Sequence, residues 1–126
     1  MLLVKTYIDK SPIHGMGCFA DQFIPKDTMI WYMSDLDLMI TKERFKKLPE
    51  TAQDYLRKHG DWDKELQSIT MSFDNDKYTN HSFTPNIRYD SQKTFAARDI
   101  EKGEELTINY YEFDESADDK LHLSLF

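Results

Sequence analysis

The sequence predicts an α+β fold dominated by short β-strands. Apolar and β-branched runs, separated by Gly, Pro, Asn and Asp, recur along the chain, whereas helical spacing occurs in a single stretch, residues 41–59. The predicted strands are short, and the one helical stretch is expected to be an insertion in a β-rich fold. A chain of 126 residues is large enough for one hydrophobic core, and a single domain over residues 1–126 is therefore predicted.

The expected strands follow the apolar runs. The third is joined to the second by a bend at Pro25 within residues 22–27. The stretch before Phe73 alternates polar and apolar side chains, which is typical of a half-buried strand. The predicted strands are Leu2–Ile8, Gly17–Asp21, Thr28–Met33, Leu66–Phe73, Thr94–Arg98 and Glu105–Tyr110.

Residues 41–59 predict two short helices. Phe45, Leu48, Ala52, Tyr55 and Leu56 recur at helical spacing. A capping threonine at position 41 begins the first helix, and the proline at position 49 breaks the run and opens the second. The glycine at position 60 is a stop signal.

The C-terminal stretch predicts a tail. Tyr111–Asp119 carries five carboxylates, at positions 112, 114, 115, 118 and 119, and is expected to be solvated. Leu121, Leu123 and Leu125 then alternate with other residues up to Phe126, a pattern that allows a terminal strand or a docking arm.

Composition excludes several function classes. Lys plus Arg is 16 and Asp plus Glu is 23, so the formal charge is 16 − 23 = −7. This balance argues against a nucleic-acid surface and suits a basic partner, although acidity that serves solubility alone is the more common explanation. The lone Cys18 permits neither an internal disulfide nor a cysteine-built zinc site, and Asp35 and Asp37 lack a third ligand nearby, so no metal is expected.

The localisation expected from the sequence is intracellular and soluble. A reducing compartment fits the single cysteine. The N-terminal apolar run is too short for a signal peptide, and no run is long enough to span a membrane. The cytoplasm is predicted, or the nucleus if the source is eukaryotic or viral.

Three short motifs carry the functional prediction. Gly15-Met16-Gly17 lets the backbone bend sharply and approach a ligand, yet Gly-x-Gly alone is more often a hairpin turn, and the third glycine of a dinucleotide fingerprint is missing. Tyr78–Asn86, with Asn80-His81-Ser82 and Pro85, reads as a hydrogen-bonded turn. Gly103–Tyr110 is a turn that feeds a strand ending on tyrosine. Taken singly, the last two segments are ordinary β-turns.

Together and in this order, the motifs resemble those of a SET domain, the fold of most protein lysine methyltransferases. The resemblance runs from Leu3 to Phe113 and is closest to the minimal stand-alone SET proteins of viruses and bacteria. It implies a β-clip fold with a knot-like crossing of the last two motifs. The implied divisions are a core at about 3–113, a helical insertion at about 41–60, and an acidic tail with a C-terminal arm at 112–126.

The resemblance also implies a cofactor, S-adenosylmethionine, which becomes S-adenosylhomocysteine, and no metal. The backbone around Gly15, Met16 and Gly17 would hold its methionine part, the Asn80 side chain would bind its amino group, and the main chain of His81 would bind adenine. Tyr110 would be the catalytic tyrosine. The expected substrate is a lysine, entering from the opposite face through a narrow channel.

The departures from the family pattern concern that channel. Tyr111 stands where a glycine is usual, Phe83 replaces a frequent cysteine, and no cysteine cluster follows the domain. The channel wall must then come from other residues, for which Tyr78, Tyr111 and Phe113 are the candidates.

The predicted function is S-adenosylmethionine-dependent transfer of methyl groups to lysine ε-amines of a protein, for example a basic, histone-like tail. The alternative from another class is an inert SET-like binding module, and a third interpretation is an unrelated β-clip domain without cofactor. Neither nucleic acid nor membrane is an expected partner. A homodimer through the C-terminal segment is the oligomer that this interpretation allows.

Overall fold

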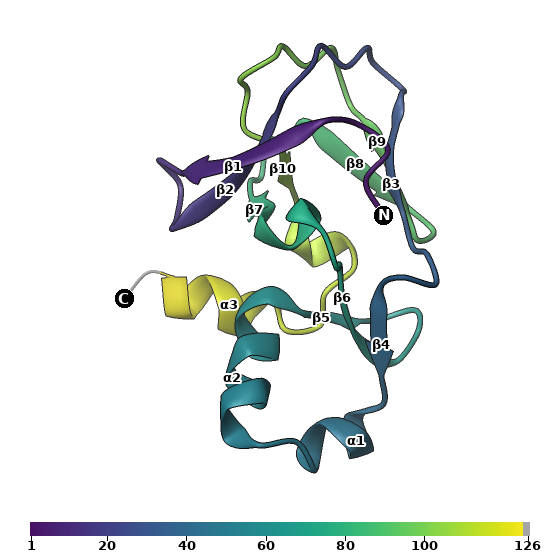
Figure 1. Cartoon of the computed structure of the whole chain (residues 1–126), viewed down its shortest axis with the longest axis vertical. Helices are drawn as coiled ribbons and strands as arrows, with labels where there is room; N and C mark the ends of the chain where they lie inside the picture. The colour runs from purple at the N-terminus through teal and green to yellow at the C-terminus, as the bar shows by residue number, and fades with distance from the viewer. Residues whose placement is uncertain (125–126) are drawn as a thin grey trace.

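The computed structural model describes residues 1–124, with side chains through Leu121, as several small sheets and three helices within that range (Figure 1). The strands are β1 Thr6–Lys10, β2 Met16–Ala20, β3 Met29–Tyr32, β4 Leu38–Ile40, β5 Asp61–Asp63, β6 Ser68–Met71, β7 Asn80–His81, β8 Ile87–Asp90, β9 Lys93–Ala96 and β10 Thr107–Ile108. The helices are α1 Lys42–Lys46, α2 Glu50–His59 and α3 Ala117–Ser124, and the single 3₁₀ turns are η1 Asn75–Tyr78 and η2 Tyr110–Glu112.

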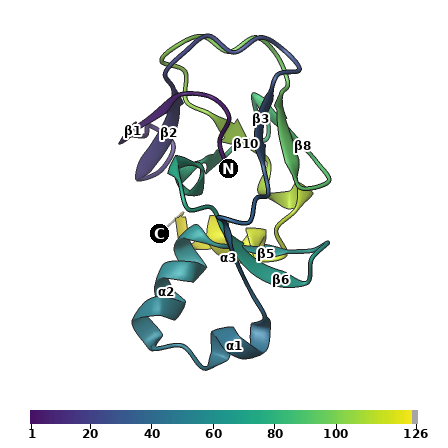
Figure 2. The same ribbon diagram turned by 45° about the vertical axis from the view of Figure 1, so that its right-hand side comes forward.

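The sheet topology confirms the predicted β-dominated α+β class. β1 pairs with β2 and β3–β9–β8 form an antiparallel sheet, while β4–β6–β5 form a second one next to the helices (Figure 2). β7 and β10 run parallel, although 25 residues separate them in the chain. A parallel pair requires a long connection, and here β8 and β9 lie within it.

The N-terminal strand begins later than predicted. Leu2 forms an isolated bridge with Trp31, and the amide of Leu3 donates to the carbonyl of Ile30. The chain then changes partner and pairs with β2 from Thr6 onward. The predicted strand Leu2–Ile8 therefore pairs first with β3 and then with β2. A pattern of apolar residues does not show such a change of partner. β2 and β3 likewise do not pair with each other, because each has another partner.

The β8–β9 hairpin explains why β8 was missed. Its two turn residues, Ser91 and Gln92, have φ of +48° and +65°. Tight hairpin turns of this kind usually contain Asn-Gly or Asp-Gly, and Ser-Gln gives no such signal. Gln92 instead receives tertiary support, because its Nε2 donates to Asp63 Oδ2 at 3.0 Å.

The helical insertion follows the sequence closely. Thr41 caps α1 by accepting from the amide of Arg44 at 3.2 Å, and α2 begins directly after Pro49. Gly60 ends α2 in an extended conformation rather than a left-handed one. Its role is steric, because a Cβ there would lie 2.7 Å from the Leu56 carbonyl oxygen.

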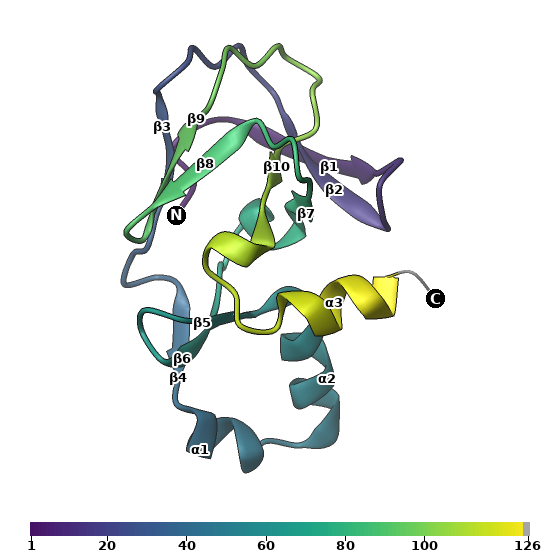
Figure 3. The same cartoon turned by 180° about the vertical axis from the view of Figure 1, so that it is seen from behind.

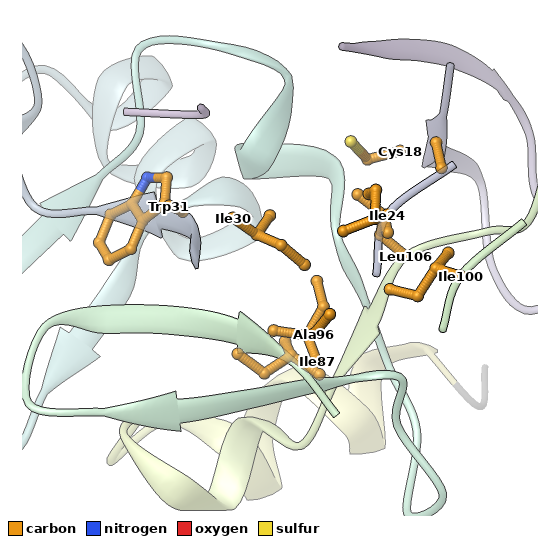
Figure 4. Close-up of a cluster of buried hydrophobic side chains, with 10 residues drawn as sticks. Cys18, Ile24, Ile30, Trp31, Ile87, Ala96, Ile100 and Leu106 are labelled. Atoms are coloured by element: carbon orange, nitrogen blue, oxygen red, sulfur yellow. The ribbon is translucent and has the colours of Figure 1, made fainter. Parts of the chain in front are cut away.

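Two hydrophobic clusters hold the described chain together. The larger one fills the space between the β1–β2 and β3–β9–β8 sheets; Figure 4 shows Ile24, Ile30, Ile100 and Leu106 within it. The smaller one lies in the insertion and consists of Ile40, Phe45, Leu56 and Ile69. The smaller cluster is built from β4, α1, α2 and β6, which form a separate lobe of the molecule. This lobe, which contains the helical insertion, therefore has its own core.

The C-terminal segment corrects the predicted solvated tail and terminal strand. Residues 117–124 form α3, which lies beside α2 and below η2 when seen from behind (Figure 3). Glu112, Glu115, Asp118 and Asp119 are exposed as expected of a solvated acidic run, but Asp114 is 1 % exposed. The part of the predicted arm at 125–126 lies outside the described residues.

No helix within residues 1–124 has the length and apolarity needed to cross a bilayer.

Candidate active site

The candidate site is organised by the crossing of β7 and β10. Asn86 Nδ2 donates to the Glu105 carbonyl at 2.8 Å, and the Thr107 amide donates to Asn86 Oδ1, also at 2.8 Å. Ser82 adds a backbone bond to Ile108 at 3.0 Å. Because Asn86 is 2 % exposed, these bonds replace water completely and fix the two segments against each other.

The glycine loop is tied to the same crossing by Asn80 and Glu105. Asn80 Nδ2 donates to the carbonyls of His14 at 3.0 Å and Met16 at 3.3 Å, and to Glu105 Oε2 at 2.9 Å. The Glu105 carboxylate also accepts from Ser11 Oγ at 2.7 Å and occupies the space beside Gly17. A Cβ on Gly17 would lie 2.5 Å from Glu105 Oε2, so any larger residue here would displace this carboxylate.

Gly15 has a different role in the loop. Its φ is +48°, in the left-handed region, and nothing lies within 4 Å of the position a Cβ would take. Gly15 and Met16 are exposed. The loop therefore presents open backbone to solvent on one side, while its other side is fixed by Asn80.

His81 and Tyr110 are joined directly. The Tyr110 amide donates to His81 Nδ1 at 3.1 Å, so the imidazole does have a role, which the sequence did not reveal. Burial lowers the pKa of His81, which favours the neutral ring with its proton on Nε2. That Nε2 is buried and has no hydrogen-bond partner among the described residues.

Tyr110 stands at the start of η2 rather than at the end of a strand. Its hydroxyl donates to the Thr79 carbonyl at 2.7 Å. Burial, the largest cause, raises the pKa of Tyr110, so its phenol stays protonated at any ordinary pH. Tyr110 therefore contacts both sides of the crossing. Its amide binds His81 on one side, and its hydroxyl binds Thr79 on the other.

A cavity of about 60 Å³ opens on the Thr79 side of Tyr110. It lies between the β3–β9–β8 sheet, the insertion and α3, and carboxylates of Asp61, Asp63 and Asp76 line it together with Phe113. Burial raises the pKa of Asp76 to about 7.

The three predicted channel residues take separate positions. Phe113 lines the cavity, and its ring centroid lies 6.4 Å from that of Tyr110. Tyr78 packs edge-on against His59 of α2 at 5.3 Å. Tyr111 lies on the His81 side, outside the cavity lining, where its hydroxyl donates to Asp118 at 2.6 Å.

An exposed aromatic cluster adjoins His81. The Phe83 ring stacks on the Tyr111 ring at 5.9 Å with an interplanar angle of 15°, and it meets the His81 ring edge-on at 4.4 Å. Phe83 is 72 % exposed, so a large flat face is open to solvent at the end of β7. Such a face can stack a planar ring.

Sequence reasoning missed Glu105, Asp61, Asp114 and Lys120. Glu105 was within a recognised motif, but its contact with Asn80 spans 25 positions. Asp114 was expected to be solvated with the rest of the acidic stretch, and Asp61 and Lys120 carried no sequence signal, because their pairing spans 59 positions. Among the side chains that the structure describes, those of residues 1–121, no three His, Cys, Asp or Glu form a group that could hold a metal ion.

The sequence matches the SET domain family over residues 15–111, which is most of the chain. The chain therefore belongs to the SET-domain family. The interpretation as an unrelated β-clip domain is excluded by this membership.

Solved structures share this fold. A Plasmodium falciparum protein described as a candidate histone methyltransferase is 24 % identical, with a TM-score of 0.59, over 86 % of this chain and 95 % of that one. Chaetomium thermophilum Polycomb repressive complex 2 bound to the compound GSK126 matches with a TM-score of 0.69 and 22 % identity, and the same complex in an autoinhibited conformation bound to S-adenosylmethionine matches with 0.65 and 21 %. In both cases the match covers 95 % of this chain and only 17 % of the other.

Proposed function

We propose that this chain is an S-adenosylmethionine-dependent protein-lysine N-methyltransferase. The observation that carries the proposal is the position of Tyr110, whose amide binds His81 beside the glycine loop and whose hydroxyl binds Thr79 at the cavity. One residue thus borders both a candidate cofactor surface and a candidate lysine cavity. Methyl transfer requires just such a meeting of two ligands at one point.

The residues of the glycine loop and β7 fit the cofactor. Gly15, Met16 and Gly17 would offer backbone groups to its methionine part, at the side where Gly15 is open. The three bonds described for the Asn80 side chain all use Nδ2, so its Oδ1 would accept from the cofactor's ammonium group. The main chain of His81 would bind adenine, with Phe83 and Tyr111 as the stacking face. When bound, the cofactor supplies an electrophilic methyl group on sulfur.

Tyr110 would orient the substrate amine. Its O–H donates to Thr79, so the oxygen lone pairs remain to accept from an amine N–H. A free lysine has a pKa of about 10.4 and must be neutral to attack. Enclosure beside Phe113 disfavours the ammonium form, and the buried carboxyl of Asp76 is a local group able to take up its proton.

The substrate class we propose is a lysine-bearing protein segment with basic neighbours. The acidic chain, with its formal charge of −7, and the exposed carboxylates between Glu112 and Asp119 favour such a segment electrostatically. A histone-like tail is one segment of this kind. Binding of the segment by a pair of identical chains is part of the same proposal.

The alternative is an inert SET-like binding module. It is favoured by one observation, that the chain's own Lys120 lies at the cavity next to Tyr110. Binding of the cofactor product without turnover on any lysine peptide would support it.

Calorimetric titration with S-adenosylhomocysteine tests the proposal. Saturable binding is expected, and Asn80→Ala should weaken it by roughly 1–3 kcal/mol, the scale of a buried polar partner left unpaired. Since Asn80→Ala also removes internal bonds, Phe83→Ala serves as a second variant, because its exposed ring contributes little to folding. It should weaken binding by about 0.5–1.5 kcal/mol through lost stacking.

A matched control is Asn75→Ala, which removes a hydrogen bond to Thr6 Oγ1, and Thr6 pairs with Ala20 at the end of the β1–β2 ladder opposite to Met16. It should bind the ligand as the wild type does. Absence of binding by the folded wild-type protein would remove the basis of the enzyme proposal. Binding followed by methylation of lysine peptides, detected as a mass gain, would distinguish the enzyme from the inert module.

A further inference from the structure

Helix α3 inserts a lysine into the cavity beside Tyr110. Lys120 Nζ lies 2.9 Å from Asp61 Oδ1 and 2.5 Å from Asp114 Oδ2, and 5.2 Å from the centre of the Tyr110 ring. The Lys120 side chain is only 12 % exposed, whereas its neighbours Asp118 and Asp119 face solvent. An ammonium group is thus held at the aromatic ring that the proposed reaction would use.

One of the two carboxylates that receive this ammonium, that of Asp114, is positioned by other donors as well. Asp114 Oδ1 accepts from the Trp62 amide at 3.0 Å and from the amide and hydroxyl of Ser116 at 2.9 and 2.7 Å. Its other oxygen, Oδ2, is the one that faces Lys120. Three donors therefore hold Asp114 Oδ1, and Oδ2 is left to face Lys120.

The Lys120 ammonium remains charged in this position. The two carboxylates raise its pKa against the opposing effect of burial. A charged amine has no lone pair for attack, so Lys120 in this position is an occupant rather than a methyl acceptor. A buried ammonium group is costly unless it is paired, and here two aspartates pair with it.

We infer that α3 is an autoinhibitory segment, in which Lys120 occupies the cavity position that the substrate lysine must take. This inference rests on the proposed function. A substrate lysine would enter by replacing Lys120 at Asp61 and Asp114, and α3 would move away from the cavity. The carboxylates would then recruit the incoming ammonium before it loses its proton closer to Tyr110.

The contacts of α3 are compatible with displacement. They include the two Lys120 ion pairs, the hydrogen bond from Tyr111 to Asp118, and the buried methyl group of Ala117. Polar contacts of this kind can be exchanged for equivalent ones from a ligand.

The test compares peptide affinity in three proteins that are all saturated with S-adenosylhomocysteine: wild type, Lys120→Ala and Lys58→Ala. The probes are pentalysine and penta-arginine, measured by fluorescence anisotropy. Lys120→Ala should bind pentalysine about tenfold or more tightly than wild type, because the peptide no longer has to displace the Lys120 side chain from the cavity before it binds. Lys58 lines the same cavity, so Lys58→Ala is a control for loss of one positive charge.

Specificity decides the interpretation. The gain in Lys120→Ala should be much larger for pentalysine than for penta-arginine, and Lys58→Ala should change both affinities equally. Equal gains for both peptides in Lys120→Ala, or no gain, would overturn the inference. Retained binding of S-adenosylhomocysteine in that case would leave the proposed function standing, whereas loss of cofactor binding by wild type would remove both.

A measurement on the wild type covers the case in which Lys120→Ala does not fold. Amide hydrogen exchange of residues 117–124 should accelerate when pentalysine is added and remain unchanged with penta-arginine. Unchanged exchange at saturating pentalysine would contradict displacement of α3.

Discussion

Single residues connect the motifs of the candidate site. Glu105 contacts Asn80, Ser11 and the space beside Gly17, so one carboxylate joins the glycine loop, β7 and the start of β10. Tyr110 performs the same role on the other side of the crossing, through His81 and Thr79. The site is therefore a set of interdependent contacts, in which a change of one atom is felt at several motifs.

Gly17→Ala tests the contact with Glu105. Its Cβ would lie 2.5 Å from Glu105 Oε2, which must move and abandon Asn80. We expect a loss of about 1–3 kcal/mol in the free energy of unfolding, together with weaker S-adenosylhomocysteine binding. Chemical denaturation and calorimetry measure the two effects. Unchanged stability would show that Glu105 adapts without cost.

Tyr110→Phe tests the proposed catalytic hydroxyl. Turnover should fall by about a hundredfold or more, the scale of one lost preorganised hydrogen bond. Affinity for S-adenosylhomocysteine should be unchanged, because the amide bond to His81 remains. Tyr7→Phe, in β1 and stacked on Phe19, is the matched control and should be as active as wild type. Full activity of Tyr110→Phe in a methylation assay would remove the hydroxyl from the mechanism.

At the scale of elements, the insertion behaves as a lobe with its own core. α1, α2 and the β4–β6–β5 sheet enclose Ile40, Phe45, Leu56 and Ile69, while the crossing of β7 and β10 belongs to the larger cluster. α3 lies next to this lobe (Figure 1), and the ammonium of its Lys120 lies 5.2 Å from the centre of the Tyr110 ring. Stability and binding are thus expected to respond to different parts of the chain.

Phe45→Ala tests this separation. Phe45 is 5 % exposed and packs edge-on against Trp62 at 5.6 Å. Its removal should cost about 3–5 kcal/mol of unfolding free energy through lost burial and a cavity. Binding of S-adenosylhomocysteine to the remaining folded protein at low temperature should be unaffected. Met39→Ala, at a side chain that is 56 % exposed, should cost far less. Equal costs in urea denaturation would contradict the assignment of this core.

At the scale of the whole molecule, buried carboxyl groups make stability depend on pH. Burial raises the pKa of Asp76 from 3.8 to about 7, with a hydrogen bond from Ser72 opposing the shift. The folded state therefore binds a proton that the unfolded chain releases above pH 4. This contribution stabilises the fold at low pH and is lost as pH rises through about 7.

Asp76→Asn should remove this pH dependence. Between pH 5 and pH 8, the unfolding free energy of the wild type should fall by about 2 kcal/mol relative to the variant. Asp90→Asn changes an exposed carboxylate and should follow the wild type. Denaturation curves at the two pH values provide the measurement, and parallel behaviour of wild type and Asp76→Asn would place the proton elsewhere.

The sequence by itself determined the features that depend on local chemistry. The Thr41 cap, the break at Pro49, the stop at Gly60 and most strand positions follow from propensities that act over a few residues. The glycine loop and the two later motifs were sufficient to predict the SET-domain family, because the crossing requires these residue types in this order.

Only the tertiary structure decided which charges are buried. Lys120 and Asp61 are 59 positions apart, and nothing in the few residues around either one indicates an opposite charge to pair with. The Ser91-Gln92 turn and the role of His81 toward Tyr110 likewise depend on partners far along the chain. A buried charge is stable only when a specific opposite charge meets it in space, and that pairing is a property of the fold rather than of any segment.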